Sequence, residues 1–174
     1  VLFERHKFYK FLAEHRGADV AQNTFATHPN LCNPKSGGYL RGRAEWFRLQ
    51  SACAIDRECA LLSASYGLFQ IMGFNYAYCG FESVDDFVKA ISTTEGVQLQ
   101  AFVAFVLHKK NASMLDCLRA HDWAGFARLY NGVNYAQNDY DSKLSAAYRR
   151  YVALYPAVIE AATKTEKPRK TKTA

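Results

Sequence analysis

The sequence predicts a mainly α-helical fold, because apolar residues recur with the 3.6-residue period of a helix in several separate segments. Val84, Phe87, Val88 and Ile91 are one such repeat. Each repeat follows a polar residue of the kind that caps helices, and the alternation typical of strands is scarce. We therefore expect helices with little or no β structure.

The expected helices can be placed in order along the chain. One runs from about Arg43 to Ile55, and Asp56 caps the next, which continues through Leu62. Residues 16–39 are rich in Gly, Pro and Asn, so a long loop is expected there, and long loops are often functional. Later helices begin after capping residues and extend to about residue 162: Ser83, Thr94, Asp122, and either Asp141 or Ser142.

The chain carries a formal net charge of +6 over 174 residues, and most of it lies at the C-terminal end. Residues 164–174 hold five basic residues against one acidic residue. We expect a helical domain over residues 1–163 and a basic disordered tail over 164–174. Such a tail is either a solvated end or a contact for polyanions such as lipopolysaccharide, an acidic membrane face or nucleic acid. No apolar run approaches the roughly 20 residues that span a bilayer.

The five cysteines indicate reduced thiols rather than disulfides or a metal site. Their number is odd and no CxxC pair occurs, whereas disulfide frameworks and zinc sites use paired ligands. Most are expected to be buried as small apolar groups. The five histidines show no metal-ligand spacing either, so neither a metal nor a cofactor is predicted.

Two segments combine amides with apolar or aromatic residues. Gln70 is embedded in the apolar run 68–72, so we expect it to be at least half buried, either bonded to backbone or exposed to a ligand on a cleft wall. Tyr130 and Asn131 precede Gly132 at a helix end, and Tyr135 follows. Aromatic rings beside amides suit sugars, although Tyr130 as a core residue is an equally simple interpretation.

Taken together, these segments resemble the N-acetylmuramidase domain of modular phage endolysins, a relative of goose-type lysozymes and lytic transglycosylases. The resemblance extends from Leu2 to about Tyr151. Its elements are Leu2 to Phe8, Ser65 to Asn75, Cys79 to Phe81, Glu95 to Val103, Asp122 to Ala127 and Tyr130 to Gly132.

The resemblance implies a lysozyme-like helical domain with a cleft, acting on peptidoglycan glycan strands. Cleavage of the β-1,4 bond between N-acetylmuramic acid and N-acetylglucosamine needs a carboxylic acid and usually a second carboxylate. Glu4 is the candidate catalytic residue. The implied substrate-binding residues are Ser65, Gly67, Gln70, Tyr130, Asn131 and Tyr135, and the accessory ones are His6 and Asp139.

The role of Glu4 stays open between general acid and second carboxylate. In related enzymes the catalytic Glu commonly lies in a Glu-Ser-Gly element, on a helix upstream of the segment that resembles residues 2–8. Residues 1–174 do not contain that element, so whether the general acid lies upstream of Val1 stays open, as does the presence of the separate wall-binding module that modular endolysins carry. Glu95 is interpreted as a helix-capping residue.

Three other functions stay open. A lytic transglycosylase would form 1,6-anhydro products, and a truncated domain would bind the wall without cleaving it. A nucleic-acid module is the weakest alternative, because the charge lies in the tail and no binding motif is present. The resemblance further implies a monomer made in the cytoplasm of the bacterial host and acting on the periplasmic wall.

Overall fold

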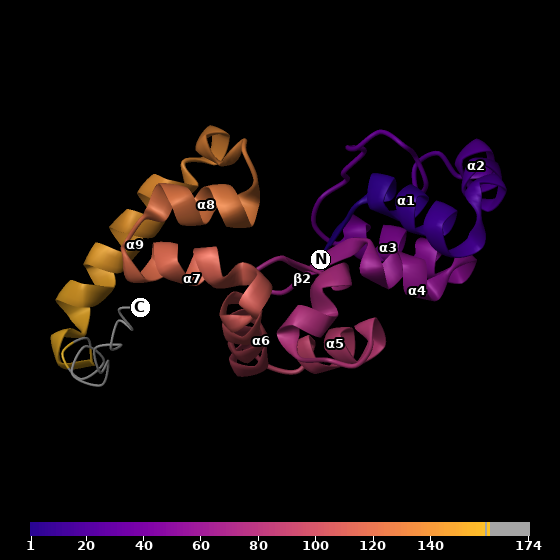
Figure 1. Ribbon diagram of the computed structural model, residues 1–174. Coiled ribbons are helices and arrows are strands. Elements are labelled where there is room, and N and C mark those ends of the chain that lie inside the picture. Colours follow the sequence, from indigo (N-terminus) through magenta and orange to yellow (C-terminus); the bar gives the residue numbers. More distant parts are fainter. Residues whose placement is uncertain (159, 161–174) are drawn as a thin grey trace, which may run out of the picture. The chain divides into compact units, whose positions relative to one another are not determined.

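Helices make up most of the chain in the computed structural model, which describes residues 1–158 and 160 (Figure 1). The expectation of a mainly α-helical fold is confirmed. The chain forms two units, Val1–Asn111 (unit 1) and Ala112–Ala174 (unit 2), and each is described by itself. The predicted boundary at residue 163 and the basic tail lie outside the described residues.

The β structure of unit 1 is one small antiparallel sheet in the order β1-β2-β3. Its strands are β1 (Leu2–Phe3), β2 (Ala64–Tyr66) and β3 (Ile71–Met72). Leu2 pairs with Ser65, and Ser65 pairs with Met72. This pairing brings the first residues of the chain beside the segment around residue 65, which lies more than sixty positions later.

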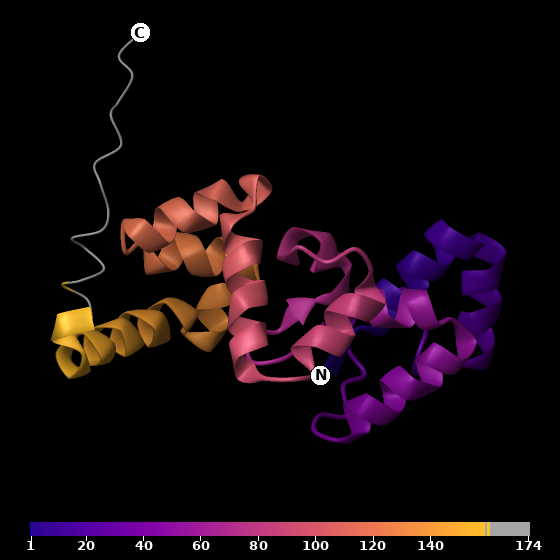
Figure 2. The ribbon, with the colours of Figure 1, turned by 90° about the horizontal axis from the view of Figure 1, so that it is seen from below.

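Four helices pack around one another in the first part of unit 1, and both ribbon views show α1 beside α2 (Figures 1 and 2). They are α1 (Arg5–Arg16), α2 (Ala18–Thr27), α3 (Ala44–Ile55) and α4 (Arg57–Leu62). Helices α3 and α4 confirm the predictions. The Asp56 carboxylate caps α4 as expected, because it accepts a hydrogen bond from the backbone N–H of Cys59 at 2.9 Å.

Helix α2 corrects the prediction that residues 16–39 form one long loop. Residues 18–27 are helical, and the irregular segment extends over residues 28–43 instead. The buried face of α2 consists of Ala21 and Thr24, one small and one polar residue. A face of this composition gives almost no apolar periodicity, and for that reason the sequence pattern did not indicate a helix.

The 3₁₀ helix η1 (Gly73–Cys79) is followed by α5 (Val84–Ile91), α6 (Glu95–Leu107) and the 3₁₀ helix η2 (Lys109–Asn111) (Figure 2). Both η1 and α5 pack against α4. The predicted caps are confirmed here. Ser83 accepts from the backbone N–H of Asp86 at 3.0 Å, and Thr94 accepts from that of Val97 at 3.2 Å.

Aromatic side chains from β1, α1 and α5 fill the core of unit 1. Phe3, Phe8 and Phe87 have no exposed surface, and the rings of Phe3 and Phe8 are 5.7 Å apart.

All five cysteines of the chain are free, as expected, and three of them are buried: Cys32, Cys59 and Cys79. Burial raises the pKa of the Cys32 thiol to about 11 and those of the other two to about 12, which keeps them protonated.

Unit 2 consists of α7 (Ala112–Arg119), α8 (Trp123–Asn131), η3 (Tyr135–Asn138) and α9 (Tyr140–Leu154). Asp122 caps α8 as predicted, because it accepts from the backbone N–H of Gly125 at 2.9 Å. Helix α9 begins before the expected Asp141 or Ser142, after a left-handed Asp139 that makes no side-chain cap. The buried core of the described part of this unit is thin, with Phe126 and Ala127 at its centre.

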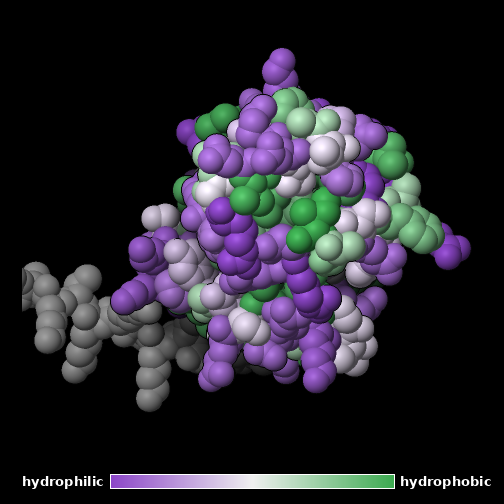
Figure 3. Space-filling model, turned by 90° about the vertical axis from the view of Figure 1, so that its right-hand side faces the viewer, coloured by the Kyte–Doolittle hydropathy of each residue, from purple (hydrophilic) through white to green (hydrophobic). Residues whose placement is uncertain are grey.

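The face that carries α2 shows small, separate apolar patches among hydrophilic side chains (Figure 3). Among the described helices, none combines the length and the apolar character that crossing a bilayer requires.

Candidate functional site

The turn between β2 and β3 is held by its own polar groups. Gly67 and Gln70 both have positive φ, 71° and 51°. The Gln70 amide donates to the Gly67 carbonyl oxygen at 2.8 Å, and its Oε1 accepts from the Ser65 hydroxyl at 3.0 Å. The structure therefore brings together the three predicted residues Ser65, Gly67 and Gln70.

Gln70 lies at the surface of the turn rather than in the core. Its side chain is exposed, because the left-handed conformation at residue 70 turns it out of the apolar run. The adjacent Phe69 ring instead stacks on Phe102, with the centroids 4.4 Å apart. Gln70 thus braces the turn while one N–H and further acceptor capacity of its amide stay open to solvent.

A second amide, which the sequence analysis did not single out, fixes the same turn from outside. Gln98 Oε1 accepts from the backbone N–H of Leu68 at 2.8 Å, and its Nε2 donates to the Ile91 carbonyl at 2.9 Å. A Cβ added at Gly67 would lie 2.8 Å from Gln98 Oε1. The turn is consequently tied to the end of α5 and the start of α6.

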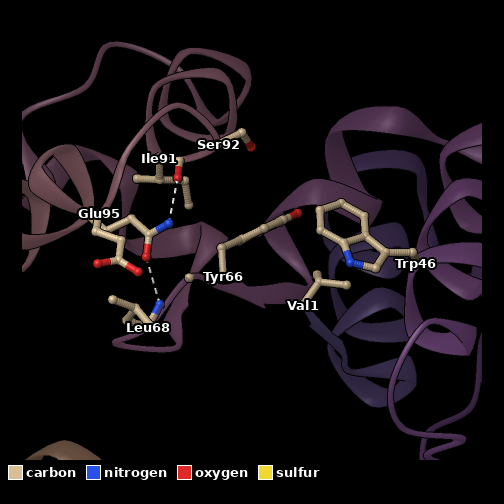
Figure 4. A pocket seen from close by; sticks show the side chains of 9 residues that line it. Val1, Trp46, Tyr66, Leu68, Ile91, Ser92 and Glu95 are labelled. Carbon is tan, nitrogen blue, oxygen red and sulfur yellow. Dashed lines mark hydrogen bonds between the residues drawn. The ribbon is translucent and has the colours of Figure 1, made fainter.

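This turn forms one wall of a cavity of about 390 Å³ in unit 1 (Figure 4). Its apolar lining is Val1, Trp46, Tyr66, Leu68 and Ile91. Its remaining lining is Gly67, Ser92, Glu95 and Gln98. The volume falls within the roughly 300–1,000 Å³ typical of small-molecule sites.

Glu95 is the carboxylate in this lining. The interpretation of Glu95 as the helix cap is wrong, because Thr94 occupies the cap position and accepts the hydrogen bond. Glu95 is the first residue of α6 and is exposed. In the close view its side chain and that of Trp46 lie on opposite sides of Tyr66 (Figure 4).

Glu4 does not line this cavity, although Val1 does. Glu4 lies at the boundary between β1 and α1, where its backbone N–H donates to the Ser63 carbonyl at 2.9 Å. Its side chain is 15% exposed, and its Oε2 accepts from the Tyr39 hydroxyl at 2.8 Å. The predicted catalytic carboxylate is thus partly shielded from solvent, and one of its oxygens already accepts a hydrogen bond.

His6 and Tyr39 set the electrostatics around Glu4. The His6 Nδ1 is buried 3.2 Å from Glu4 Oε2, but without the geometry of a hydrogen bond. Burial lowers the pKa of His6 and outweighs the nearby carboxylate, so the imidazole is neutral at pH 7. Burial and the bond to Glu4 raise the pKa of Tyr39 to about 12, which keeps its hydroxyl a donor.

A buried ion pair that the sequence analysis missed organises the surroundings of Glu4. Glu45 Oε2 accepts from Arg48 at 2.8 Å and from the backbone N–H of Phe3 at 3.2 Å. Its Oε1 accepts from the backbone N–H groups of Leu40 at 2.6 Å and Arg41 at 3.1 Å. Burial alone would raise the pKa of Glu45, but these donors lower it overall. The sequence did contain a signal for this pair: Glu45 and Arg48 lie three residues apart on a helix face that is otherwise apolar.

The remaining predicted residues lie close together in sequence at one end of α8. Tyr130 is half-buried and stacks on Phe126, with the centroids 5.5 Å apart, while Asn131 is exposed. Tyr135 is half-buried in η3, and the accessory candidate Asp139 is exposed. Because each unit is described by itself, a groove shared by these residues and Gln70 stays a prediction.

Two further cavities contain none of the predicted site residues. One of about 560 Å³ in unit 1 lies between residues 27–31 and 38–40, beside Arg48. The other, of about 370 Å³ in unit 2, lies beside Asp122, Asp141 and Arg149. In the described part of the chain, no three His, Cys, Asp or Glu side chains are grouped as metal ligands would be.

Comparison with known proteins identifies the family. Residues 1–152 match the protein family described as N-acetylmuramidase. The chain belongs to the N-acetylmuramidase family. The crystal structure of an endolysin from the Burkholderia phage AP3 is similar to this N-acetylmuramidase-family chain, with a TM-score of 0.76 and 46% sequence identity. That similarity covers 88% of this chain and 55% of the endolysin chain, so this chain spans about half of that protein. A search of curated proteins gave no match.

Proposed function

We propose that this chain cleaves peptidoglycan glycan strands at the β-1,4 bond between N-acetylmuramic acid and N-acetylglucosamine, as part of a phage endolysin. The observation that carries this proposal is the cavity beside the Gly67–Gln70 turn, in a chain of the N-acetylmuramidase family. The turn is braced from both sides, so its exposed groups are fixed before a substrate arrives. A fixed binding surface lowers the entropy cost of positioning a sugar.

Within this proposal, Ser65, Gly67 and Gln70 position the glycan, and Tyr130, Asn131 and Tyr135 contribute from unit 2. Glu4 acts as the general acid or as the second carboxylate, and its Oε2 accepts a hydrogen bond from the Tyr39 hydroxyl at 2.8 Å. A second carboxylate can orient water or stabilise an oxocarbenium-like centre. In the second role, the general acid would come from a Glu-Ser-Gly element like that of the related enzymes.

The test measures soluble muropeptides released from purified Gram-negative peptidoglycan. Two proteins are compared: the chain itself, and the chain joined to the part of the AP3 endolysin that the similarity does not cover. We expect release by the joined protein, reduced roughly 100-fold or more by Glu4→Gln and unaffected by Glu14→Gln on the exposed face of α1. No release by the joined protein would contradict the proposal.

The products separate the open alternatives. Hydrolysis leaves a reducing end that contains the elements of water, whereas a lytic transglycosylase leaves a 1,6-anhydro end that is lighter by one water. Mass spectrometry of the released fragments distinguishes the two. Binding to peptidoglycan without any release would indicate the non-catalytic wall-binding alternative.

Action on the periplasmic wall after synthesis in the host cytoplasm, and a monomeric state, are part of the same proposal. The basic residues proposed to contact anionic lipopolysaccharide or membrane, 164–172, lie outside the described residues. Their contribution therefore rests on the charge pattern of the sequence.

A further inference from the structure

We propose that the cavity beside the Gly67–Gln70 turn is a subsite for an N-acetylated hexosamine, with Trp46 and Glu95 as its specificity-determining residues. This inference rests on the proposed action on glycan strands and names the part of the substrate that this cavity holds. Neither residue belongs to the set predicted from the sequence. They come from different elements, α3 and the start of α6, and line the same cavity.

The apolar half of the cavity fits the face of a pyranose ring. Trp46 is 46% exposed, although tryptophan usually buries most of its large apolar surface. Its indole faces the same cavity as Val1, at the amino end of β1 (Figure 4). The C–H groups on one face of a hexosamine form an apolar surface that covers an indole well. An exposed tryptophan in a cavity wall therefore indicates a stacking platform.

The opposite half offers what an acetamido group requires. An acetamido group has an N–H that needs an acceptor and a methyl group that needs apolar contact. Glu95 supplies carboxylate oxygens, which accept hydrogen bonds, and no ion pair occupies them in the described part of the chain. Leu68 supplies an apolar side chain that is 64% exposed on the same wall.

Gln98 fixes the position of Leu68 relative to Glu95. One of its amide atoms bonds to the backbone of Leu68 and the other to that of Ile91, so the turn cannot drift away from the start of α6. Gln98 lies three residues after Glu95 on the same helix. The acceptor and the apolar contact thus have a fixed spacing, which is what discrimination for an acetamido group needs.

Binding of triacetylchitotriose, an N-acetylated trisaccharide, tests the location of the subsite by tryptophan fluorescence. The chain has two tryptophans, Trp46 and Trp123. We expect the Trp123→Phe variant to shift its emission on titration and the Trp46→Phe variant to stay silent. The reverse pattern, or no shift in either variant up to millimolar sugar, would overturn the proposal.

Calorimetric affinities test the two assigned roles. We expect Trp46→Ala and Glu95→Gln each to weaken triacetylchitotriose binding by roughly tenfold or more. The matched controls are Phe47→Ala, an exposed aromatic next to Trp46 that does not line the cavity, and Glu82→Gln, an exposed acid outside it. Both should bind as the unmodified chain does. Deacetylated chitotriose should bind at least tenfold more weakly than the acetylated sugar.

The outcomes separate this inference from the proposed function. Unchanged trisaccharide affinity in Trp46→Ala and Glu95→Gln would refute the subsite, even if the joined protein released muropeptides from the wall. Conversely, Trp46-dependent and acetyl-dependent binding without any release would support the subsite and contradict the proposed cleavage.

Discussion

At the scale of single residues, the strongest constraint near Glu4 is the buried carboxylate of Glu45. It is 1% exposed and holds Arg48, the strand β1 and the irregular segment at residues 40–41 through four hydrogen bonds. Arg48 in turn donates to the carbonyl oxygens of Phe3 and Asn30. The Glu45–Arg48 pair thereby ties α3 to β1 and to Asn30, which are distant from it in sequence.

We expect Glu45→Gln to destabilise unit 1 by about 3–5 kcal/mol, because it leaves the buried Arg48 cation without its counter-ion. The new amide also presents N–H groups to backbone N–H groups, so at least one donor loses its acceptor. Urea unfolding followed by circular dichroism measures the change. Glu14→Gln, which removes one half of an exposed pair with Lys10, should leave the unfolding midpoint almost unchanged. Equal effects of the two variants would contradict the assigned role of Glu45.

At the scale of elements, the turn between β2 and β3 depends on a glycine. Gly67 has φ of +71°, a conformation that costs an L residue free energy, and its missing side chain leaves room for Gln98. The Gln98 amide cannot swing aside without breaking its bonds to Leu68 and Ile91. Backbone conformation and the surrounding contacts therefore both require glycine here.

We expect Gly67→Ala to lower the unfolding free energy by about 1–2 kcal/mol and to impair wall cleavage, because the turn shifts. Gly96→Ala is the matched control on the neighbouring helix. Its added Cβ would meet Thr94 Oγ1 at an ordinary 3.7 Å, so its stability should stay level or rise by up to about 1 kcal/mol. Thermal unfolding of the chain measures the change in stability, and muropeptide release by the joined protein measures the change in cleavage. An intact and active Gly67→Ala chain would contradict the role given to the turn.

Sequence reasoning succeeded where an element is determined by neighbouring residues. The caps at Asp56, Ser83, Thr94 and Asp122 are local signals, and the structure confirms all four. It failed for α2, because the face that α2 buries is small and polar. The cavity was not predictable in this way, because its walls come from segments around residues 46, 67 and 95 that only the fold brings together.

At the scale of the whole molecule, acid should destabilise this chain through groups in unit 1. The pKa of His6 is lowered by burial. Asp56 is half-buried, and the hydrogen bonds from Arg16 and the Cys59 backbone outweigh that partial burial and lower its pKa, as the donors around Glu45 do for that carboxylate. In all three cases the unfolded chain binds the proton more readily than the folded chain does.

The sign of the pH dependence follows directly. The contribution of His6 is complete above its ordinary pKa of 6.5 and is lost as the pH falls below it, and Glu45 and Asp56 add to the loss below about 4.5. We expect Tm to be highest near neutral pH and to fall in these two stages. The variant His6→Gln should flatten the first stage, whereas His28→Gln, at an exposed site, should not. A Tm that rises on acidification from pH 7 to 5 would contradict this account.

Gln98 makes two hydrogen bonds, one to the turn between β2 and β3 and one to the end of α5. These bonds make saccharide binding depend on the folded state of unit 1. A saccharide that touches Trp46, Leu68 and Glu95 can be held only while three distant stretches of the chain are assembled. By mass action, such a ligand stabilises the native state at the expense of the unfolded one. The glycan strand that this chain is proposed to cleave would therefore also raise its free energy of unfolding while bound. Released fragments that still bind the cavity would have the same effect.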